Sequence, residues 1–196
     1  MKKNRILHSK YIDDLGLTMS IRKLDLINDF EVLHDWMHRP YISPFWKLDV
    51  SNEDFSAYLK RTTSTPGREH FIFELDGEPF SFLLTYLVRN EDLKDHYDDF
   101  DINDIGVHVV IGERSYIAEK YVVPYFQLGL DFVFKRNKES KKIIGEPDRR
   151  NRIIIPSAKK AGFISRGKIT LPHKVANLIV ADRIKFYERN EDETHV

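Results

Sequence analysis

The sequence has 196 residues, of which 41% are hydrophobic, and it balances 31 Lys and Arg against 31 Asp and Glu. A chain of this length and composition is expected to form a globular domain with a sizeable core, and its lack of net charge excludes an overall field that would attract nucleic acid or an anionic membrane. The absence of cysteine excludes disulfides, zinc-thiolate sites and an acyl-cysteine intermediate, so any group transfer is expected to be direct.

The chain carries no signal for export or membrane insertion. No apolar run approaches the roughly 20 residues that a bilayer-spanning helix needs, and the N-terminal stretch MKKNRILHSKYIDD lacks the apolar core of a signal peptide. The sequence also has no internal repeat and no Gly-, Ser- or Pro-rich linker. We therefore predict one domain over residues 1–196 in the cytoplasm, with a solvated, disordered tail at residues 189–196.

The first half of the chain predicts a strand, two helices and a hairpin. The segment LTMSIRKLD alternates as a strand does, and DLINDFEVLHDWMH follows with apolar residues at helical spacing as far as Pro40, which ends that helix. Ser51, with Asp54 three residues later, forms a capping-box pattern before a second helix. The dipeptide Asp76-Gly77 separates two apolar runs, which predicts two antiparallel strands joined by a tight turn.

The second half predicts alternating strands and helices. An acidic connection, NEDLKDHYDDFDIND, leads into the strand IGVHVVIG, and a helix is expected over residues 121–135. A short buried strand in KKIIGEP precedes a helix over residues 151–160 that ends at Gly162. The stretches GFISRGKITL and KVANLIVADRIKFYE are expected to be the terminal strands. This order predicts an α/β fold with a mixed, mostly antiparallel central sheet flanked by helices.

His108 lies in the middle of the IGVHVVIG strand. Period-two alternation places it on one face with Gly106, Val110 and Gly112, and small neighbours would leave space beside the imidazole. A hydrogen-bonded core or surface histidine is the alternative that the spacing alone favours. The following GERSYIAEKYVV has the strand-turn-helix layout in which backbone N–H groups bind phosphate, although it lacks the glycines usual in such a turn.

A second polar group, EPDRRN, follows the KKIIG strand. The carboxylates of Glu146 and Asp148 come at the carboxyl end of a sheet strand, where open α/β sheets place their ligands, so this strand end and that of His108 could converge. The alternative is structural, with Asp148 capping the next helix while Arg149 and Arg150 are solvated. The two interpretations are compatible.

An aromatic segment, WMHRPYISPFW, ends the first predicted helix. Phe45 and Trp46 are interpreted as a wall for a small amphipathic substrate, with packing at the helix end as the alternative. His34 and His38 have the i,i+4 spacing of a helical metal site, but without a third ligand or an HExxH pattern no metal is predicted. The acidic residues 91–104 lack the spacing of an EF-hand and are expected to form a solvated loop.

Four of these motifs resemble those of a known family. WMHRPYISPFW, DIGVHVVIG, EPDRRN and LPHK follow one another within residues 17–188. Together with the order of elements, they resemble the GCN5-related N-acetyltransferases, and in particular the siderophore-biosynthesis acyltransferases, such as the aerobactin-type N-hydroxylysine acetyltransferases and the mycobactin lysine acyltransferases. The resemblance implies a fold whose sheet splays beside its fourth strand, where the acyl-CoA thioester enters.

The resemblance also assigns roles to residues. It makes His108 and Asp148 the catalytic pair, with backbone N–H groups after His108 polarising the thioester carbonyl. The co-substrate, acetyl-CoA or another acyl-CoA with no metal, is expected to contact Val109, Val110, Ile111, Ala118, Lys120, Tyr121 and Asn151. The small-molecule acceptor, an amine or hydroxylamine, is expected to contact Phe45, Trp46, His173 and Lys174.

The function implied is direct transfer of an acyl group to the nitrogen of N-hydroxylysine or an N-hydroxylated diamine during hydroxamate siderophore biosynthesis, with other siderophore-assembly enzymes as possible partners. Histidine suits the role of base because it titrates near neutral pH. A hydroxylamine acceptor is largely unprotonated at that pH, so it depends less on a base and more on positioning than an amine does.

The sequence departs from the family at the phosphate-binding turn. Where the family has Q/R-x-x-G-x-G/A, residues 115–120 read SYIAEK, so both glycines are replaced. This departure predicts weaker CoA binding or a different acyl donor. Two alternatives stay open: an aminoglycoside 6'-N-acetyltransferase, whose family has similar EPD and KAGF elements, and a non-catalytic binding module with the same fold.

Overall fold

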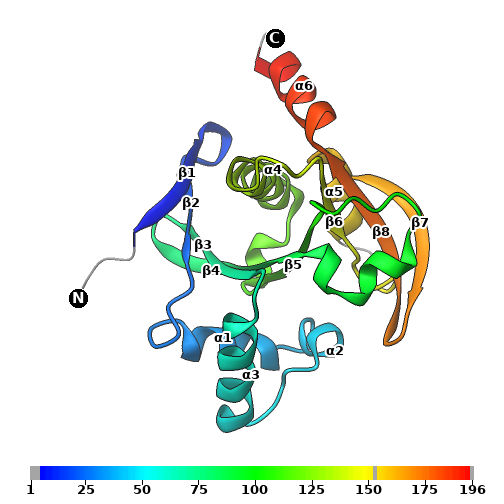
Figure 1. Ribbon diagram of the computed structural model, residues 1–196. Helices are drawn as coiled ribbons and strands as arrows, with labels where there is room; N and C mark the ends of the chain where they lie inside the picture. Colours follow the sequence, from blue (N-terminus) through cyan, green and yellow to red (C-terminus); the bar gives the residue numbers. More distant parts are fainter. Residues whose placement is uncertain (1–4, 152–153, 195–196) are drawn as a thin grey trace. The chain divides into compact units, whose positions relative to one another are not determined.

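The computed structural model describes residues 5–151 and 154–194 (Figure 1). Within these residues, the strands form an eight-stranded sheet in the order β1-β2-β3-β4-β5-β6-β8-β7. The pairs β1–β2, β2–β3, β6–β8 and β7–β8 are antiparallel, and β5–β6 is parallel. The predicted α/β fold with a mixed, mostly antiparallel sheet is therefore confirmed. The strands are β1 (Ile6–Ile12), β2 (Leu17–Lys23), β3 (Arg68–Leu75), β4 (Glu78–Leu87), β5 (Ile105–Ile111), β6 (Lys142–Gly145), β7 (Ile164–Leu171) and β8 (Lys174–Asp182).

The chain is organised as two compact units. The first takes its described residues from 1–84 and 109–116, and the second takes its described residues from 85–108 and 117–196. Strands β4 and β5 each contribute residues to both. The helices are α1 (Phe30–His38), α2 (Ser43–Trp46), α3 (Asn52–Ser64), α4 (Glu119–Arg136), α5 (Ile154–Lys160) and α6 (Arg183–Thr194).

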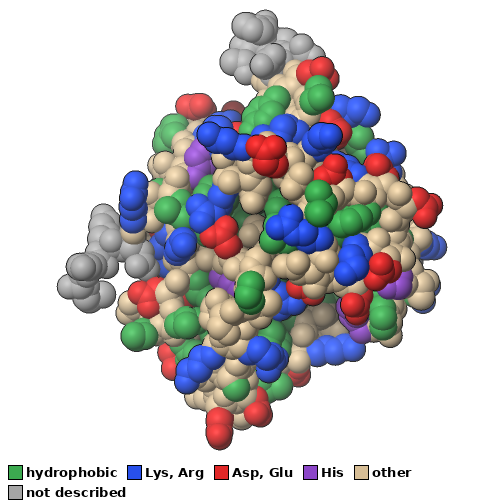
Figure 2. Space-filling view, in the orientation of Figure 1, with side chains coloured by type: hydrophobic (Ala, Val, Ile, Leu, Met, Phe, Trp, Pro, Cys, Tyr) green, Lys and Arg blue, Asp and Glu red, His purple; other side chains and the backbone are tan. Residues whose placement is uncertain are grey.

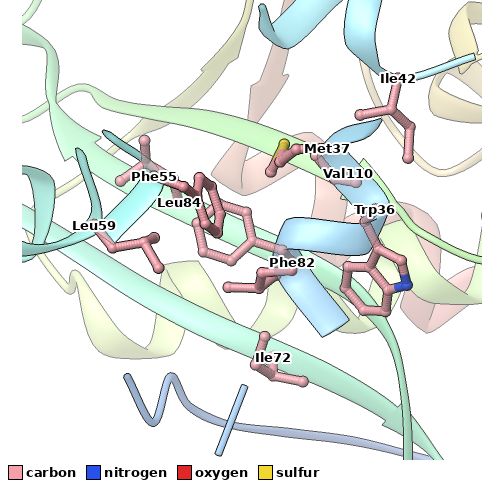
Figure 3. Packing of buried hydrophobic residues seen from close by; sticks show 10 residues of the cluster. Trp36, Met37, Ile42, Phe55, Leu59, Ile72, Phe82, Leu84 and Val110 are labelled. Atoms are coloured by element: carbon pink, nitrogen blue, oxygen red, sulfur yellow. The ribbon is translucent and has the colours of Figure 1, made fainter. Parts of the chain in front are cut away.

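The first unit buries an apolar cluster between helices α1 and α3 and the strands they cover (Figure 3). Trp36 and Met37 of α1 and Phe55 of α3 are among its fully buried members. Helix α3 begins as predicted, because the Ser51 hydroxyl accepts a hydrogen bond of 3.1 Å from the Asp54 N–H. The cluster also includes Leu33, Ile42, Leu59, Ile72, Phe82, Leu84 and Val110.

The predicted hairpin in the first unit is also confirmed. Strands β3 and β4 are joined through Asp76 and Gly77, whose φ angles of 48° and 92° lie in the left-handed region. Two consecutive residues with positive φ give a tight turn that matches the twist of the flanking strands. The Asp76 carboxylate adds a 2.8 Å hydrogen bond from the Thr18 N–H, which ties the turn to β2.

The second unit packs α4 against α5 and β6 (Figure 1). The strands of this unit carry a buried apolar cluster that includes Tyr86, Ile144 and Leu178. Strands β7 and β8 form a hairpin whose turn is Pro172 and His173. This turn presents the LPHK motif at the start of β8.

The C-terminal segment differs from the prediction. We expected a strand throughout KVANLIVADRIKFYE, but β8 ends at Asp182 and α6 begins at Arg183, so the strand prediction was wrong from Arg183 onward. The Asp182 carboxylate accepts a 3.1 Å hydrogen bond from the Lys185 N–H, as an N-cap does. The Arg183 guanidinium donates to the carbonyl of Phe134 in the last turn of α4 and to those of Asn137 and Ser140 after it, with bonds of 2.6 to 2.9 Å.

Other helices and strands also differ from the prediction. Strand β1 was not predicted, and the first helix begins at Phe30 rather than near Asp25. The helix predicted over 151–160 is α5 from Ile154 onward, and residues 152–153 lie outside the described part of the chain. The disorder predicted for residues 189–196 stays a prediction, since α6 extends through Thr194 and residues 195–196 are not described.

Charge is evenly mixed over the face drawn in Figure 2. Lys and Arg side chains are interspersed there with Asp and Glu side chains. Among the helices of the described segments, none combines the length and apolar character needed to cross a membrane.

A buried ionic network connects β2, β3 and the start of α1. The Arg22 guanidinium donates to both carboxylate oxygens of Asp29, at 2.7 Å each, and to Glu74 at 2.5 Å. The side chains of Arg22 and Asp29 are only 7% and 3% exposed. Removal of the guanidinium would leave two buried carboxylates without their counter-charge.

We predict that Arg22→Met lowers the free energy of unfolding by about 3–5 kcal/mol, the usual cost of breaking a buried ion pair from one side. Urea denaturation followed by circular dichroism measures the change. Arg166→Met is the matched control, because Arg166 is exposed on β7 and its loss should cost less than about 0.5 kcal/mol. A loss from Arg22→Met no larger than that of the control would contradict the prediction.

Candidate active site

His108 lies on β5, and Glu146 directly follows the end of the parallel strand β6 in the second unit. The last paired residues of β5 and β6 are Gly106 and Ile144, and each candidate side chain lies two residues farther along its strand direction. The two side chains turn toward each other beyond the last paired residues of the two strands. The His108 Nε2 atom lies 2.5 Å from the Glu146 Oε1 atom, which is a short hydrogen bond.

The Glu146 carboxylate is buried and surrounded by donors. Its side chain is 6% exposed, whereas that of His108 is 37% exposed. The Tyr86 hydroxyl donates to the same Oε1 atom at 3.3 Å, and the Lys174 ammonium lies 3.8 Å from it. Burial raises the pKa of the Glu146 carboxyl, but the neighbouring His108 and Lys174 outweigh this effect and lower the pKa to about 2. Glu146 is therefore ionised at neutral pH.

Tyr86 packs against the backbone of β5. Its ring centroid lies 5.1 Å from that of His108. Burial, followed by the charge of Glu146, raises the pKa of the Tyr86 phenol well above its ordinary value, so the hydroxyl remains a donor. A Cβ added at Gly106 would lie 2.1 Å from the ring. The space that we expected beside His108 is thus filled at Gly106 by Tyr86.

Asp148, the predicted catalytic partner of His108, bonds elsewhere. Its two carboxylate oxygens accept hydrogen bonds of 2.9 and 2.8 Å from the Arg150 guanidinium, and the Arg150 N–H adds a third at 2.8 Å. These bonds lower the pKa of Asp148 to about 2. The Asn151 N–H donates to the Asp148 carbonyl at 2.8 Å. The carboxylate that contacts the imidazole is Glu146, and a catalytic role for Asp148 stays a prediction.

In the first unit, the aromatic motif anchors the end of β5. The Arg39 guanidinium and the Tyr41 hydroxyl both donate to the Gly112 carbonyl, the former at 2.6 Å. Arg39 also forms a 3.0 Å ion pair with Glu113, to which the Trp36 indole donates at 3.3 Å. A Cβ at Gly112 would lie 2.1 Å from the Trp36 indole, so this glycine is needed for close packing.

Of the remaining aromatic and histidine candidates of the first unit, Trp46 and His34 are half-buried, whereas Phe45 and His38 are exposed. Trp46 meets the Phe82 ring edge-on at 6.0 Å, and Phe45 stays 36% exposed. His34 Nε2 bonds the Val50 carbonyl at 2.9 Å, and His38 Nδ1 bonds the His34 carbonyl at 2.9 Å. In the described part of the chain, no group of three or more potential ligands is arranged to hold a metal ion.

The turn after β5 leads into the N-terminus of α4. Ala118 is the N-cap, and no side chain caps the helix there. The Lys120 ammonium lies 4.9 Å from the Tyr121 ring centroid. Glu119, whose charge would oppose an anion, pairs with Lys160 at 2.7 Å. The Tyr121 N–H already donates to the Ala118 carbonyl at 2.9 Å. By helix geometry, the N–H groups of Glu119 and Lys120 have no partner within the helix, which is the arrangement that binds phosphate.

Comparison with known proteins assigns the family. Residues 25–171 match the family described as "Acetyltransferase (GNAT) domain". The chain belongs to this acetyltransferase family. The match covers three of the four motifs in full and the beginning of LPHK, and it confirms the resemblance inferred from the sequence.

Two curated relatives of this GNAT chain act on hydroxylated amines. An N-hydroxyputrescine acetyltransferase of Acinetobacter baumannii is 26% identical over 170 residues, which are 87% of this chain and 80% of the relative. An N(6)-hydroxylysine O-acetyltransferase of Escherichia coli is 24% identical over 181 residues, which are 92% of this chain and 57% of the relative. The chain thus spans little more than half of the second relative.

Solved structures share the GNAT fold. An uncharacterized protein from Bacillus halodurans has a TM-score of 0.87 and 26% identity, with 97% of each chain covered. The aminoglycoside acetyltransferase AAC(6')-Ib, in complex with coenzyme A, has a TM-score of 0.77 and 22% identity, with 87% of this chain and 98% of that chain covered. At this identity the second likeness supports the fold alone.

The structure brings some predicted site residues of this GNAT domain together. His108 and Lys174 meet at Glu146, while His173 lies exposed in the adjacent β7–β8 turn. Tyr86 was missed, since a tyrosine in an apolar strand carries no local signal. Glu146 was noted as a strand-end carboxylate, but its position relative to His108 depends on the register of β5 and β6, which no local sequence signal gives.

Gly106→Ala is expected to destabilise the GNAT domain by about 1–3 kcal/mol, because the added Cβ would overlap the Tyr86 ring and overpack the site. Urea denaturation of a double-mutant cycle measures the coupling. In a Tyr86→Ala background, the same glycine substitution should cost less than about 0.5 kcal/mol, since the overlapping ring is gone. Equal costs in the two backgrounds would refute the assigned packing.

The buried carboxylate also predicts a pH dependence of stability. The pKa of Glu146 in the folded protein, about 2, lies below that of an exposed glutamate, about 4.3. Ionised Glu146 therefore stabilises the fold above about pH 4, and this contribution is lost as pH falls toward about 2. The difference in unfolding free energy between the wild type and Glu146→Gln should shrink over that range.

The control for this measurement is Glu139→Gln, since Glu139 is exposed. Its difference from the wild type should stay nearly constant as pH falls. Chemical denaturation at a series of pH values gives both curves. A difference for Glu146→Gln that is flat, or that grows toward low pH, is incompatible with a depressed pKa.

Proposed function

We propose that this chain is an acyl-CoA-dependent N-acyltransferase that acylates the hydroxylamine nitrogen of N-hydroxylysine or of an N-hydroxylated diamine in hydroxamate siderophore biosynthesis. The observation that carries the proposal is the hydrogen bond between His108 and the buried, ionised Glu146 in a GNAT domain. Relatives named as acetyltransferases of N-hydroxyputrescine and N(6)-hydroxylysine support this acceptor class.

In this proposal, His108 is the general base. Its side chain is 37% exposed, and its Nε2 atom contacts the Glu146 carboxylate. The negative charge of Glu146 favours the imidazolium that forms when His108 accepts a proton. A positioned base of this kind contributes typically about 10²- to 10⁴-fold to a reaction rate.

The contiguous segment from Val109 to Tyr121 is proposed to bind the acyl-CoA co-substrate. Backbone N–H groups of Val109, Val110 and Ile111 would polarise the thioester carbonyl, and the first turn of α4, from Ala118 to Tyr121, would face the phosphates. Main-chain N–H groups do not require glycine where the backbone has ordinary φ, and Ala118 has a φ of −65°. Lys160 balances the charge of Glu119 in that turn. Asn151 stays a predicted contact.

The proposed chemical step is direct transfer. The acceptor nitrogen attacks the thioester carbon, so that a C–N bond forms and the C–S bond breaks. The proton released from nitrogen passes to His108, the departing CoA thiolate takes up one proton from solvent to become the thiol, and His108 releases its proton to solvent before the next cycle. The products are a hydroxamate and CoA, with no net gain or loss of protons or electrons.

The acceptor is proposed to approach His108 beside the LPHK turn. Lys174 already contributes its charge near Glu146, and His173 is exposed in the same turn. Phe45, Trp46 and Asp148 stay predicted contributors to the site, as do other siderophore-assembly enzymes as partners.

We predict that the protein, incubated with acetyl-CoA and N-hydroxylysine or N-hydroxyputrescine, forms a hydroxamate. A hydroxamate binds Fe³⁺ to give a coloured complex and an O-acyl hydroxylamine does not, so absorbance after addition of iron distinguishes N- from O-acylation. His108→Ala should lower kcat about 10²-fold, at the low end for a general base because the hydroxylamine is already unprotonated. Its affinity for acetyl-CoA should change less than twofold.

Titration calorimetry with acetyl-CoA and competition with kanamycin complete this test. Binding of acetyl-CoA without hydroxamate formation, or acylation of kanamycin in preference to both hydroxylamines, would overturn the proposed acceptor class. Absence of heat at high micromolar acetyl-CoA would overturn the proposed donor. Full activity in His108→Ala would remove this residue from the mechanism.

A further inference from the structure

The hydrogen bond to Glu146 determines which nitrogen of His108 carries the proton. An ionised carboxylate can only accept, so a contact of 2.5 Å between Nε2 and Oε1 requires the donor hydrogen on Nε2. In the neutral imidazole, the lone pair that can take up a proton then lies on Nδ1. The two ring nitrogens of His108 therefore have different roles.

The surroundings hold Glu146 in a single position. Its Oε1 atom is reached from three strands: by Nε2 of His108 on β5, by the Tyr86 hydroxyl on β4 at 3.3 Å, and by the Lys174 ammonium on β8 at 3.8 Å. The carboxylate is buried and directly follows the paired end of β6, where Gly145 pairs with Ile179. A carboxylate fixed in this way orients any imidazole bonded to it.

We propose that Glu146 is the positioning residue of the active site: it holds His108 in the Nε2–H tautomer and thereby makes Nδ1 the basic atom of the ring. Glu146 touches neither the acceptor nor the acyl donor and acts through the imidazole. Glu146 stays ionised throughout the reaction: it stabilises the imidazolium by its negative charge and does not accept the proton itself. This inference rests on the proposed function for the identity of the acceptor, but the tautomer does not depend on it.

Asp148 is the competing candidate for this positioning role. Both of its carboxylate oxygens bind the Arg150 side chain, and one also accepts from the Arg150 N–H. Asp148 lies four residues beyond Ile144, the last residue of β6 that pairs with β5, whereas Glu146 lies two residues beyond it. Asp148 therefore stabilises the turn that follows β6 through its bonds to Arg150, and Glu146 is the residue that contacts His108.

The first test measures the tautomer of His108 in the wild-type protein without any substrate. Proton–nitrogen correlation spectra of ¹⁵N-histidine-labelled protein, recorded at a pH where His108 is neutral, separate the two tautomers, and the His108→Gln variant assigns the signal. We expect the proton on Nε2. A proton on Nδ1 overturns the inference, whatever acceptor the enzyme uses.

The second test compares Glu146→Gln with Asp148→Asn in the same spectra. We expect the preference for the Nε2–H tautomer to weaken in Glu146→Gln, because a neutral amide can either accept from or donate to the ring, and to persist in Asp148→Asn. The opposite pattern would transfer the positioning role to Asp148. Because the wild-type spectrum alone tests the inference, a Glu146 variant that fails to fold does not remove the test.

The third test is kinetic and uses the hydroxamate assay. Glu146→Gln should lower kcat about 10-fold or more, a part of what His108 contributes, while KM for acetyl-CoA changes less than twofold. In a His108→Ala background it should have no further effect on kcat, since Glu146 acts only through the imidazole. Glu139→Gln, on an exposed residue, controls for the substitution type.

A kcat of Glu146→Gln within twofold of the wild type would overturn the positioning role, and so would an additive loss in the double variant. If the wild type forms no hydroxamate but its His108 carries the proton on Nε2, the acceptor class is wrong and the assignment of the basic atom stands. If hydroxamate forms and the proton is on Nδ1, the proposed function stands and this inference fails.

Discussion

The second unit of the protein depends on one buried charge, the carboxylate of Glu146. A carboxylate at 6% exposure is unfavourable unless opposite charges and hydrogen-bond donors compensate it. Here the compensation comes from His108, Tyr86 and Lys174, which lie on three different strands. The arrangement of β4, β5, β6 and β8 is therefore coupled to a polar contact as well as to apolar packing. The same contact gives the site its chemical asymmetry, because it distinguishes one ring nitrogen of His108 from the other.

The glycines of β5 serve this arrangement by removing side chains. Gly106 lets the Tyr86 ring lie against the strand, where its hydroxyl reaches Glu146, and in the first unit Gly112 does the same for the indole of Trp36. In both places an added Cβ would meet the ring at 2.1 Å, far inside van der Waals contact. Gly106, which shares a face with His108, therefore makes room for the Tyr86 ring and does not leave an open space beside the imidazole.

The first unit holds the far end of β5 by a separate set of polar contacts. Arg39 and Tyr41 converge on the Gly112 carbonyl, and Arg39 also pairs with Glu113. The motif WMHRPYISPFW therefore fixes the backbone that leads into the turn before α4. This turn lacks the usual glycines, and external contacts of this kind restrict its conformation without relying on special φ angles.

The sequence by itself determined the elements that rest on local physics. The Asp76-Gly77 turn, the Ser51 cap and the apolar strand carrying His108 were correctly predicted, because turn geometry, capping and period-two alternation act over a few residues. The family was also determined by motifs in their order, as the match over residues 25–171 confirms. Local pattern failed at Arg183, where the bonds that end β8 and begin α6 come from the distant turn after α4.

Only the tertiary structure decided which acid meets His108. Glu146 and Asp148 are two residues apart and both follow β6. The sequence marked both as carboxylates at a strand end, and the family resemblance selected Asp148. The choice depends on the register between β5 and β6, in which Gly106 pairs with Ile144 and thereby places His108 level with Glu146. Register is a property of two strands separated by thirty residues of chain, 112–141, which include helix α4. A shift of two residues would exchange the two carboxylates without altering a single local preference.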